Sequence, residues 1–147
     1  RTFRGLDHRT ALAGEVAGVR YYDDSKGTNV GAAVTALLGL TEARAVLLAG
    51  GRDKGGSYGP LVDALRRKGR GAVLIGEAAE ALAAAIGDAV PVARARTMDE
   101  AVELCAKMAR PGDAVLLSPA CSSFDMFRDY KHRGDEFVRC VKALGAR

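Results

Sequence analysis

Apolar residues fall into short uninterrupted runs along this chain, and the segments between the runs carry helical spacing. Three runs, at residues 45–50, 72–76 and 114–118, contain no polar alternation, which is typical of strands buried on both faces of a parallel sheet. A shorter strand is expected at residues 90–93. Helices are expected at residues 29–40, 60–68, 77–86, 98–108 and about 134–144. Four or five strands thus alternate with helices, which predicts an α/β fold with a doubly wound, mainly parallel, Rossmann-like sheet and helices on both faces.

The first 25 residues follow a different pattern. Residues 10–25 alternate weakly around Gly14 and Gly18, which predicts two short strands joined by a turn, the second ending near Tyr22. We therefore expect a short β-hairpin to open the domain. The length of 147 residues fits one domain, which we place at residues 10–147, with the polar residues 1–9 as a connection from a preceding domain.

Composition and charge narrow the possible functions. The chain is 48% apolar, with 5% aromatic residues and no tryptophan, which suits a close-packed α/β core. Its 22 basic residues are offset by 18 acidic ones, and no dense basic run occurs, so anionic metabolites are favoured as ligands over nucleic acid. No apolar run reaches membrane-spanning length and no signal peptide is evident, so we expect a cytoplasmic protein.

The cysteines indicate neither a disulfide framework nor a metal site. Cys105, Cys121 and Cys140 are odd in number, form no CxxC pair and accompany only two histidines. Cys105 and Cys140 lie in helical patterns and are expected to be small buried thiols. Cys121 is not expected to be a nucleophile, because His132, the nearer histidine in the chain, lies in the charged stretch 128–137, which we expect to be a solvated helix face.

The turn that follows the second expected strand carries several charged and hydrogen-bonding side chains close together. Asp23, Asp24, Lys26, Thr28 and Asn29 lie between a strand end and a small-residue helix, where α/β sheets place their ligands. A plainer interpretation is equally open, in which Thr28 or Asn29 caps the helix and the charges stay solvated.

Two further segments that follow strands carry groups suited to anions. Residues 50–59 are rich in glycine around Lys54, which would let backbone N–H groups and one ammonium approach an anion; a flexible turn is the alternative. Residues 118–125 include Ser122 and Ser123 ahead of a helix, an arrangement that would form a carboxylate or phosphate cradle. Because the carboxyl ends of parallel strands share one edge, we expect all three segments to converge. The chain contains no GxxxxGK[ST] loop.

The segments FRGLDHR, DDSKGTNVGAA, LLAGGRDKG and LLSPACSSFDMFRDYKHRGDEF resemble, in this order and at this spacing, the C-terminal domain of the Mur ligase family. DSKGTN together with SPACSSFD is similar to the members that add D-glutamate, whereas other Mur ligases and folylpolyglutamate synthases match less well. Asp7 stands where a proline is usual and Gly27 where an alanine is usual, and neither position carries an expected contact.

The resemblance implies an ATP-dependent, Mg²⁺-requiring amide ligase of peptidoglycan biosynthesis. In that family the carboxylate of UDP-N-acetylmuramoyl-L-alanine becomes an acyl phosphate, which the amine of D-glutamate attacks. ATP and Mg²⁺ bind mainly to a central P-loop domain that this sequence lacks, so the chain is expected to be inactive alone. We expect a monomer.

The resemblance also assigns residues to the amino acid. Thr28 and Lys54 would hold one end of D-glutamate, Ser123 and the backbone of Phe124 would hold the other carboxylate, and Tyr130 would line the pocket. Two separated anion sites suit a dianionic amino acid, because each charge-assisted hydrogen bond contributes about 1.5–3 kcal/mol.

A second set of residues is assigned by the resemblance to the nucleotide. His8 and Arg9 would contact it from the hinge, and Asp24 and Lys26 would close over ATP and its phosphates. Lys26 is expected to be the catalytic residue that stabilises charge in the transition state. These four residues would act only after the domain swings towards the nucleotide.

Two alternatives remain open from the residues alone. The chain would be part of a related Mur or folylpolyglutamate-type ligase that uses another amino acid, or a freestanding module that binds an acidic ligand. A P-loop encoded upstream would separate the ligases from the binding module, and the preferred amino acid would separate the ligases from each other.

Overall fold

The computed structural model describes residues 11–25, 29–51, 57–120 and 130–146. Its strands are β1 (Ala11–Val16), β2 (Val19–Asp23), β3 (Ala45–Gly50), β4 (Gly69–Ile75), β5 (Val92–Ala95) and β6 (Ala114–Ala120). Its helices are α2 (Val30–Gly39), α3 (Gly59–Lys68), α4 (Ala79–Ile86), α5 (Met98–Met108) and α6 (Tyr130–Gly145).

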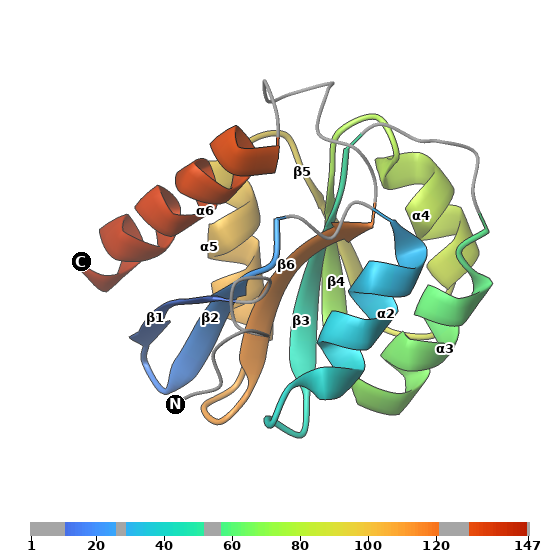
Figure 1. The fold of residues 1–147 in the computed structure, drawn as a ribbon, viewed down its shortest axis with the longest axis horizontal. Coiled ribbons are helices and arrows are strands. Elements are labelled where there is room, and N and C mark those ends of the chain that lie inside the picture. Colours follow the sequence, from blue (N-terminus) through green and yellow to red (C-terminus); the bar gives the residue numbers. More distant parts are fainter. Residues whose placement is uncertain (1–10, 26–28, 52–56, 121–129, 147) are drawn as a thin grey trace.

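The six strands form one sheet in the order β1-β2-β6-β3-β4-β5 (Figure 1). β1 pairs antiparallel with β2, and every other neighbouring pair is parallel. β6, the last strand in sequence, lies in the interior between β2 and β3. The predicted α/β fold, with a mainly parallel sheet opened by a hairpin, is confirmed.

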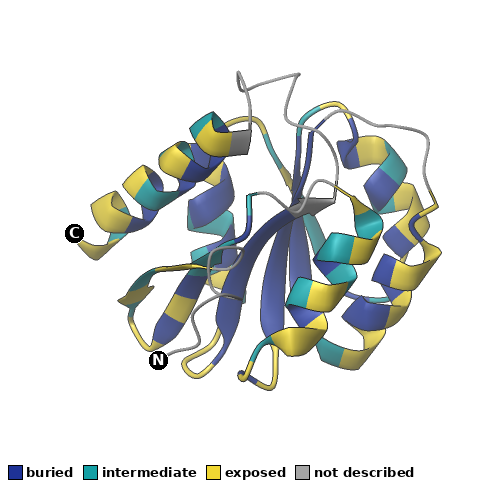
Figure 2. Cartoon of the chain, in the orientation of Figure 1, coloured by how far each residue is buried: buried dark blue, intermediate teal, exposed yellow. Residues whose placement is uncertain are grey.

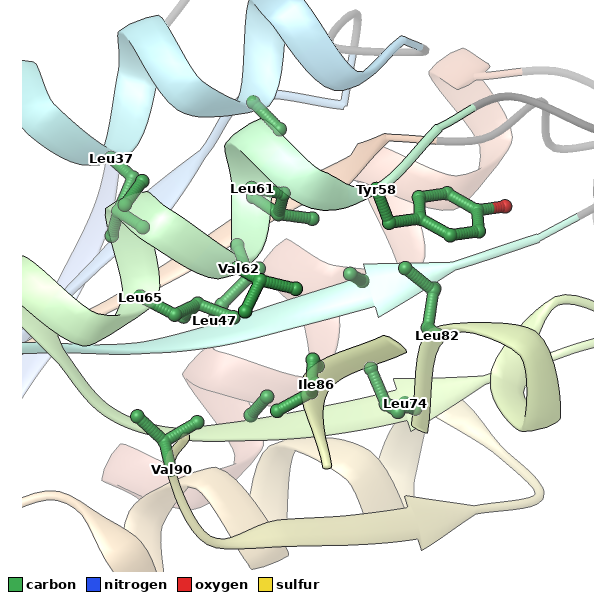
Figure 3. Packing of buried hydrophobic residues seen from close by; sticks show 14 of the residues in the cluster. Leu37, Leu47, Tyr58, Leu61, Val62, Leu65, Leu74, Leu82, Ile86 and Val90 are labelled. Carbon is green, nitrogen blue, oxygen red and sulfur yellow. The ribbon is translucent and has the colours of Figure 1, made fainter. Parts of the chain in front are cut away.

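Helices cover both faces of the sheet because alternate residues of each central strand point to opposite sides. Leu47 and Leu74 pack with α2, α3 and α4 on one face, where Figure 3 shows them close to residues of these helices. Val46 and Val73, one position earlier on each strand, pack with α5 and α6 on the other face. β3 is therefore buried along its whole length, as are residues 71–75 of β4 and 114–118 of β6 (Figure 2), which explains why these sequences lack polar alternation.

The hairpin turn consists of two residues, Ala17 and Gly18, between β1 and β2. Both have positive φ, 54° and 81°, as in the type I′ turns that match the twist of paired strands. A Cβ on Gly18 would lie 3.2 Å from Pro111 Cβ, so glycine also suits the packing there. The predicted hairpin is confirmed.

Most element boundaries agree with the sequence pattern, and the exceptions are β4, β5 and α6. α5 begins and ends as predicted, with Thr97 Oγ1 accepting the Glu100 N–H at 3.1 Å as its N-cap. β4 begins three residues earlier than predicted and β5 lies two residues later. α6 begins at Tyr130 rather than about Gly134, so the charged stretch before Gly134 is partly helical.

Candidate functional site

The three chemically dense segments follow β2, β3 and β6, which are neighbours in the sheet. Leu117 on β6 pairs with Asp23 on β2 and with Leu48 on β3. The carboxyl ends of these three parallel strands therefore meet at one edge (Figure 1). The predicted convergence of the segments is confirmed for the strands that lead into them.

The structure describes two of the residues assigned to substrates, Asp24 and the backbone of Tyr130. Tyr130 is the first residue of α6. The other assigned residues lie outside the described residues, so their placement stays a prediction: His8, Arg9, Lys26, Thr28, Lys54, Ser123 and Phe124.

Asp24 is held at the sheet edge by the neighbouring strand. Its N–H donates to the Leu117 carbonyl at 2.8 Å, which extends the β2–β6 ladder by one step. Ser118 Oγ donates to Asp24 Oδ2 at 3.2 Å, and Asp24 is only 4% exposed. The carboxylate thus accepts a hydrogen bond from the protein itself, and its expected contact with a nucleotide stays a prediction.

Asp23 closes the turn that follows β2. Its Oδ1 accepts the Ser25 N–H at 2.9 Å, the local bond by which aspartate side chains stabilise turns. Burial raises the pKa of Asp23, and hydrogen bonds from Ser25 and the positive charge of Arg133 act against that rise.

That cation, Arg133, is a residue that sequence reasoning missed. It lies on α6, is 1% exposed, and donates from Nη2 to the Ser25 carbonyl at 3.1 Å and from Nη1 to the Gly50 carbonyl at 3.5 Å. The expectation that residues 128–137 form a solvated face is wrong for Arg133. Helical spacing could have revealed it, because Arg133 precedes the buried Phe137 by four residues and so shares its face.

Arg133 can reach both the Ser25 carbonyl after β2 and the Gly50 carbonyl at the end of β3 because the next residue on α6 is glycine. A Cβ on Gly134 would lie 2.5 Å from Ser25 Oγ and 2.9 Å from Asp23 Oδ2, distances that real side chains do not tolerate. The first turns of α6 therefore lie directly against the end of β2.

Gly50, the last residue of β3, and Gly51, which follows it, have a packing role. Gly50 has φ +133°, and a Cβ there would lie 1.8 Å from the Ile75 carbonyl oxygen on β4. The Gly51 N–H donates to the same oxygen at 3.1 Å. This N–H therefore serves the turn rather than an anion, and the expectation that glycines in this segment free their N–H groups for a ligand is wrong for Gly51.

A cavity of about 280 Å³ lies between α5 and α6, and none of its lining residues belongs to the predicted site. Cys140 lines it and donates its thiol to Asp99 Oδ1 at 2.7 Å. Burial, followed by the Asp99 carboxylate, raises the pKa of Cys140 to about 12. Cys105 is fully buried and Cys140 is 4% exposed, so the prediction of small buried thiols is confirmed for both, while Cys121 lies outside the described residues.

Comparison with known proteins decides the family. The family model described as "Mur ligase, glutamate ligase domain" matches residues 8–121. The chain belongs to this family. Among the curated relatives of this Mur ligase domain is the UDP-N-acetylmuramoylalanine–D-glutamate ligase of Thiobacillus denitrificans, 53% identical over 145 residues, 98% of this chain. The same enzyme of Pseudomonas fluorescens Pf-5 is 49% identical over 147 residues.

The Mur ligase domain is much shorter than these relatives. It spans 31% of the Thiobacillus protein and 33% of the Pseudomonas protein. Two solved structures share its fold. A murein peptide ligase from Psychrobacter arcticus has a TM-score of 0.64 at 17% identity, covering 95% of this chain and 30% of that one. A ligase domain from Haemophilus ducreyi has a TM-score of 0.60 at 15% identity, with 92% and 96% covered.

Two features are absent from the described residues of this Mur ligase domain. No helix among them is long and apolar enough to cross a membrane. No group of three or more histidine, cysteine, aspartate or glutamate residues is placed to hold a metal ion in the same parts of the chain.

Proposed function

We propose that this Mur ligase domain is the amino-acid-binding part of an enzyme that adds D-glutamate to UDP-N-acetylmuramoyl-L-alanine in cytoplasmic peptidoglycan synthesis. The observation that carries the proposal is the identity of 49–53% over nearly the whole chain to ligases named for that reaction. Because the chain spans about a third of those relatives, the sites for ATP, Mg²⁺ and the UDP-sugar are assigned to the rest of the complete enzyme.

The proposed reaction has two steps. The carboxylate of UDP-N-acetylmuramoyl-L-alanine takes the γ-phosphoryl group of ATP, which releases ADP and leaves an acyl phosphate. The amine of D-glutamate then attacks the acyl carbon, loses a proton, and expels inorganic phosphate as the amide bond forms. No protein nucleophile is required, so the task of this domain is to hold the amine in line with the acyl carbon, which can supply several kcal/mol of the barrier.

Within the domain, D-glutamate would bind between segments that follow neighbouring strands. Thr28 follows β2, Lys54 follows β3, and Ser123 and Phe124 follow β6, with Tyr130 at the start of α6. The adjacency of β2, β6 and β3 supports the proposal, because it lets two anchors for one carboxylate and two for the other come from the same edge.

The residues assigned to the nucleotide are proposed to act when this domain closes against the domain that binds ATP. Asp24 is the member whose position the structure describes, and Ser118 fixes its carboxylate at the sheet edge. His8, Arg9 and Lys26 complete the set by resemblance. ATP and its Mg²⁺ would supply the phosphoryl group and charge neutralisation, while Lys26 would stabilise charge that develops on the transferring group. Residues 1–9 would be the interdomain connection about which the domain swings.

The complete protein tests this proposal in a phosphate-release assay with ATP, Mg²⁺ and UDP-N-acetylmuramoyl-L-alanine. We expect phosphate release with D-glutamate and almost none with L-glutamate. Release with a different amino acid would assign the chain to another member of the family. A complete protein that has no P-loop and releases no phosphate would instead favour a binding module for acidic ligands.

A further inference from the structure

Arg133 donates hydrogen bonds to the backbone at the carboxyl ends of β2 and β3, two strands that do not pair with each other. Ser25 follows β2, Gly50 ends β3, and β6 lies between these strands. Two strand spacings separate these ends, about 10 Å. The guanidinium of Arg133 nevertheless reaches the backbone beyond both strands, because it donates to the Ser25 carbonyl at 3.1 Å and, through a longer contact, to the Gly50 carbonyl at 3.5 Å.

These two carbonyls belong to residues that lie just before the segments with the expected D-glutamate ligands. Ser25 is followed by residues 26–28, and Gly50 lies four residues before Lys54. Arg133 itself belongs to α6, which begins six residues after Phe124. One side chain therefore links all three segments that would surround the amino acid.

The chemistry of the contact favours a fixed geometry. A guanidinium is planar and presents its donors in a rigid fork, whereas a lysine ammonium is a single flexible point charge. Arg133 is 1% exposed, so water cannot replace either acceptor without opening the fold, and a buried charge without its partners is strongly destabilising. Asp23 adds a nearby negative charge, and Gly134 leaves room for the helix to approach.

We propose that Arg133 is a positioning residue for the amino-acid substrate: by bonding the Ser25 and Gly50 carbonyls it sets the separation between the segments that carry Thr28 and Lys54. The inference rests on the proposed function for the identity of that substrate. Arg133 touches no reacting atom in this scheme. It acts through the backbone, so its loss displaces both anchors of one carboxylate together.

Steady-state kinetics of the complete ligase with Arg133→Lys and Arg133→Met test this role. We expect the KM for D-glutamate to rise about tenfold or more and kcat/KM for D-glutamate to fall about a hundredfold, the scale of a 1 Å misplacement. The KM for UDP-N-acetylmuramoyl-L-alanine, which the rest of the enzyme would bind, should stay within about twofold. A purely structural role would lower the folded fraction and leave all KM values unchanged.

Arg139→Lys is the matched control, because Arg139 lies on the same helix, is exposed, and pairs with Asp99 and Glu136. It should leave every KM unchanged. Unchanged KM for D-glutamate in both folded Arg133 variants would overturn the inference. So would a failure of even Arg133→Lys to fold, since the residue would then serve stability alone.

Nuclear magnetic resonance of the 147-residue chain separates this inference from the proposed function. The amide signals of Ser25 and Gly51 should both move in Arg133→Lys and stay in place in Arg139→Lys. If the wild-type complete protein released no phosphate with D-glutamate, the proposed function would fail. The two amide signals would still show whether Arg133 connects the ends of β2 and β3. If neither signal moved in Arg133→Lys, that connection would be overturned.

Discussion

Replacing Gly134 by alanine tests how closely α6 lies against the end of β2. The added methyl carbon would lie 2.5 Å from Ser25 Oγ, 2.9 Å from Asp23 Oδ2 and 3.1 Å from Ser25 Cβ. Rotation of the serine hydroxyl would relieve only the first of these contacts. Asp23 cannot simply turn away, because its other oxygen accepts the Ser25 N–H. The helix must therefore retreat, which also pulls Arg133 from its acceptors.

Two opposing effects set the size of the change. Overpacking of a well-filled site costs about 1–3 kcal/mol, whereas alanine improves helix propensity over glycine by about 1 kcal/mol. The net expectation is a loss of up to about 2 kcal/mol in the free energy of unfolding. For a chain of this size that lowers the melting temperature by up to about 8 °C, measurable by circular dichroism during thermal and urea unfolding.

A second substitution identifies the cause. Ser25→Ala removes the atom at 2.5 Å, so the pair Ser25→Ala and Gly134→Ala should show a favourable coupling of about 0.5 kcal/mol or more in a double-mutant cycle. Gly39→Ala in α2 is the matched control, since nothing lies within 4 Å of a Cβ there, and it should be neutral or slightly stabilising. A Gly134→Ala variant as stable as the wild type, with no coupling to Ser25, would refute the contact.

Three further predictions concern the rest of the fold. Burial acts to raise the pKa of Asp113, but hydrogen bonds from Arg70 and the Arg110 N–H outweigh it and hold the pKa below its usual value. Asp113→Asn should therefore lower the free energy of unfolding by about 1–3 kcal/mol at pH 7. This loss should shrink as pH falls below about 4, where the wild-type carboxylate becomes protonated. Leu116→Ala should cost about 2–5 kcal/mol in urea unfolding, because Leu116 is fully buried. Because burial raises the pKa of both thiols, Cys105 and Cys140 should resist iodoacetamide at pH 8 in the folded chain and react after unfolding. Peptide mapping by mass spectrometry would show the difference.

Exposed residues supply the controls. Asp63→Asn removes a solvent-exposed pair with Arg66 and should change stability by less than about 0.5 kcal/mol at any pH. Leu12 is 58% exposed, so Leu12→Ala should also stay within that range. An Asp113→Asn variant whose deficit is the same at pH 3 and pH 7 would contradict the assigned ion pair. Rapid labelling of Cys140 in the folded chain would contradict its burial.

The strands were predictable because the sheet has helices on both faces. A segment such as residues 45–50 has no solvent side, so a short uninterrupted apolar run favours a strand that is buried on both faces. The position of β6 between β2 and β3 was not predictable in the same way. Apolar runs identify strands but carry no information on their order, which depends on packing between residues about 70–100 positions apart.

The candidate site was predictable in its location more than in its internal contacts. Sheet topology brings Asp24 to the expected edge, but its bond to Ser118 joins residues 94 positions apart. Arg133 was missed because its charged neighbours dominate the local composition, and because the acceptors that allow its burial lie 83 and 108 residues earlier. The four-residue spacing to Phe137 points to the buried face of the helix, but the acceptors that make burial of a cation there tolerable are seen only in the structure.

The interior place of β6 also bears on how this domain is made. β2 and β3 have no direct pairing with each other, and each pairs with β6. During synthesis the ribosome has delivered more than three-quarters of these 147 residues before the strand that joins them is complete. The hairpin can therefore join the rest of the sheet only after β6 has been made, and the edge formed by the carboxyl ends of β2, β6 and β3 is completed late in folding.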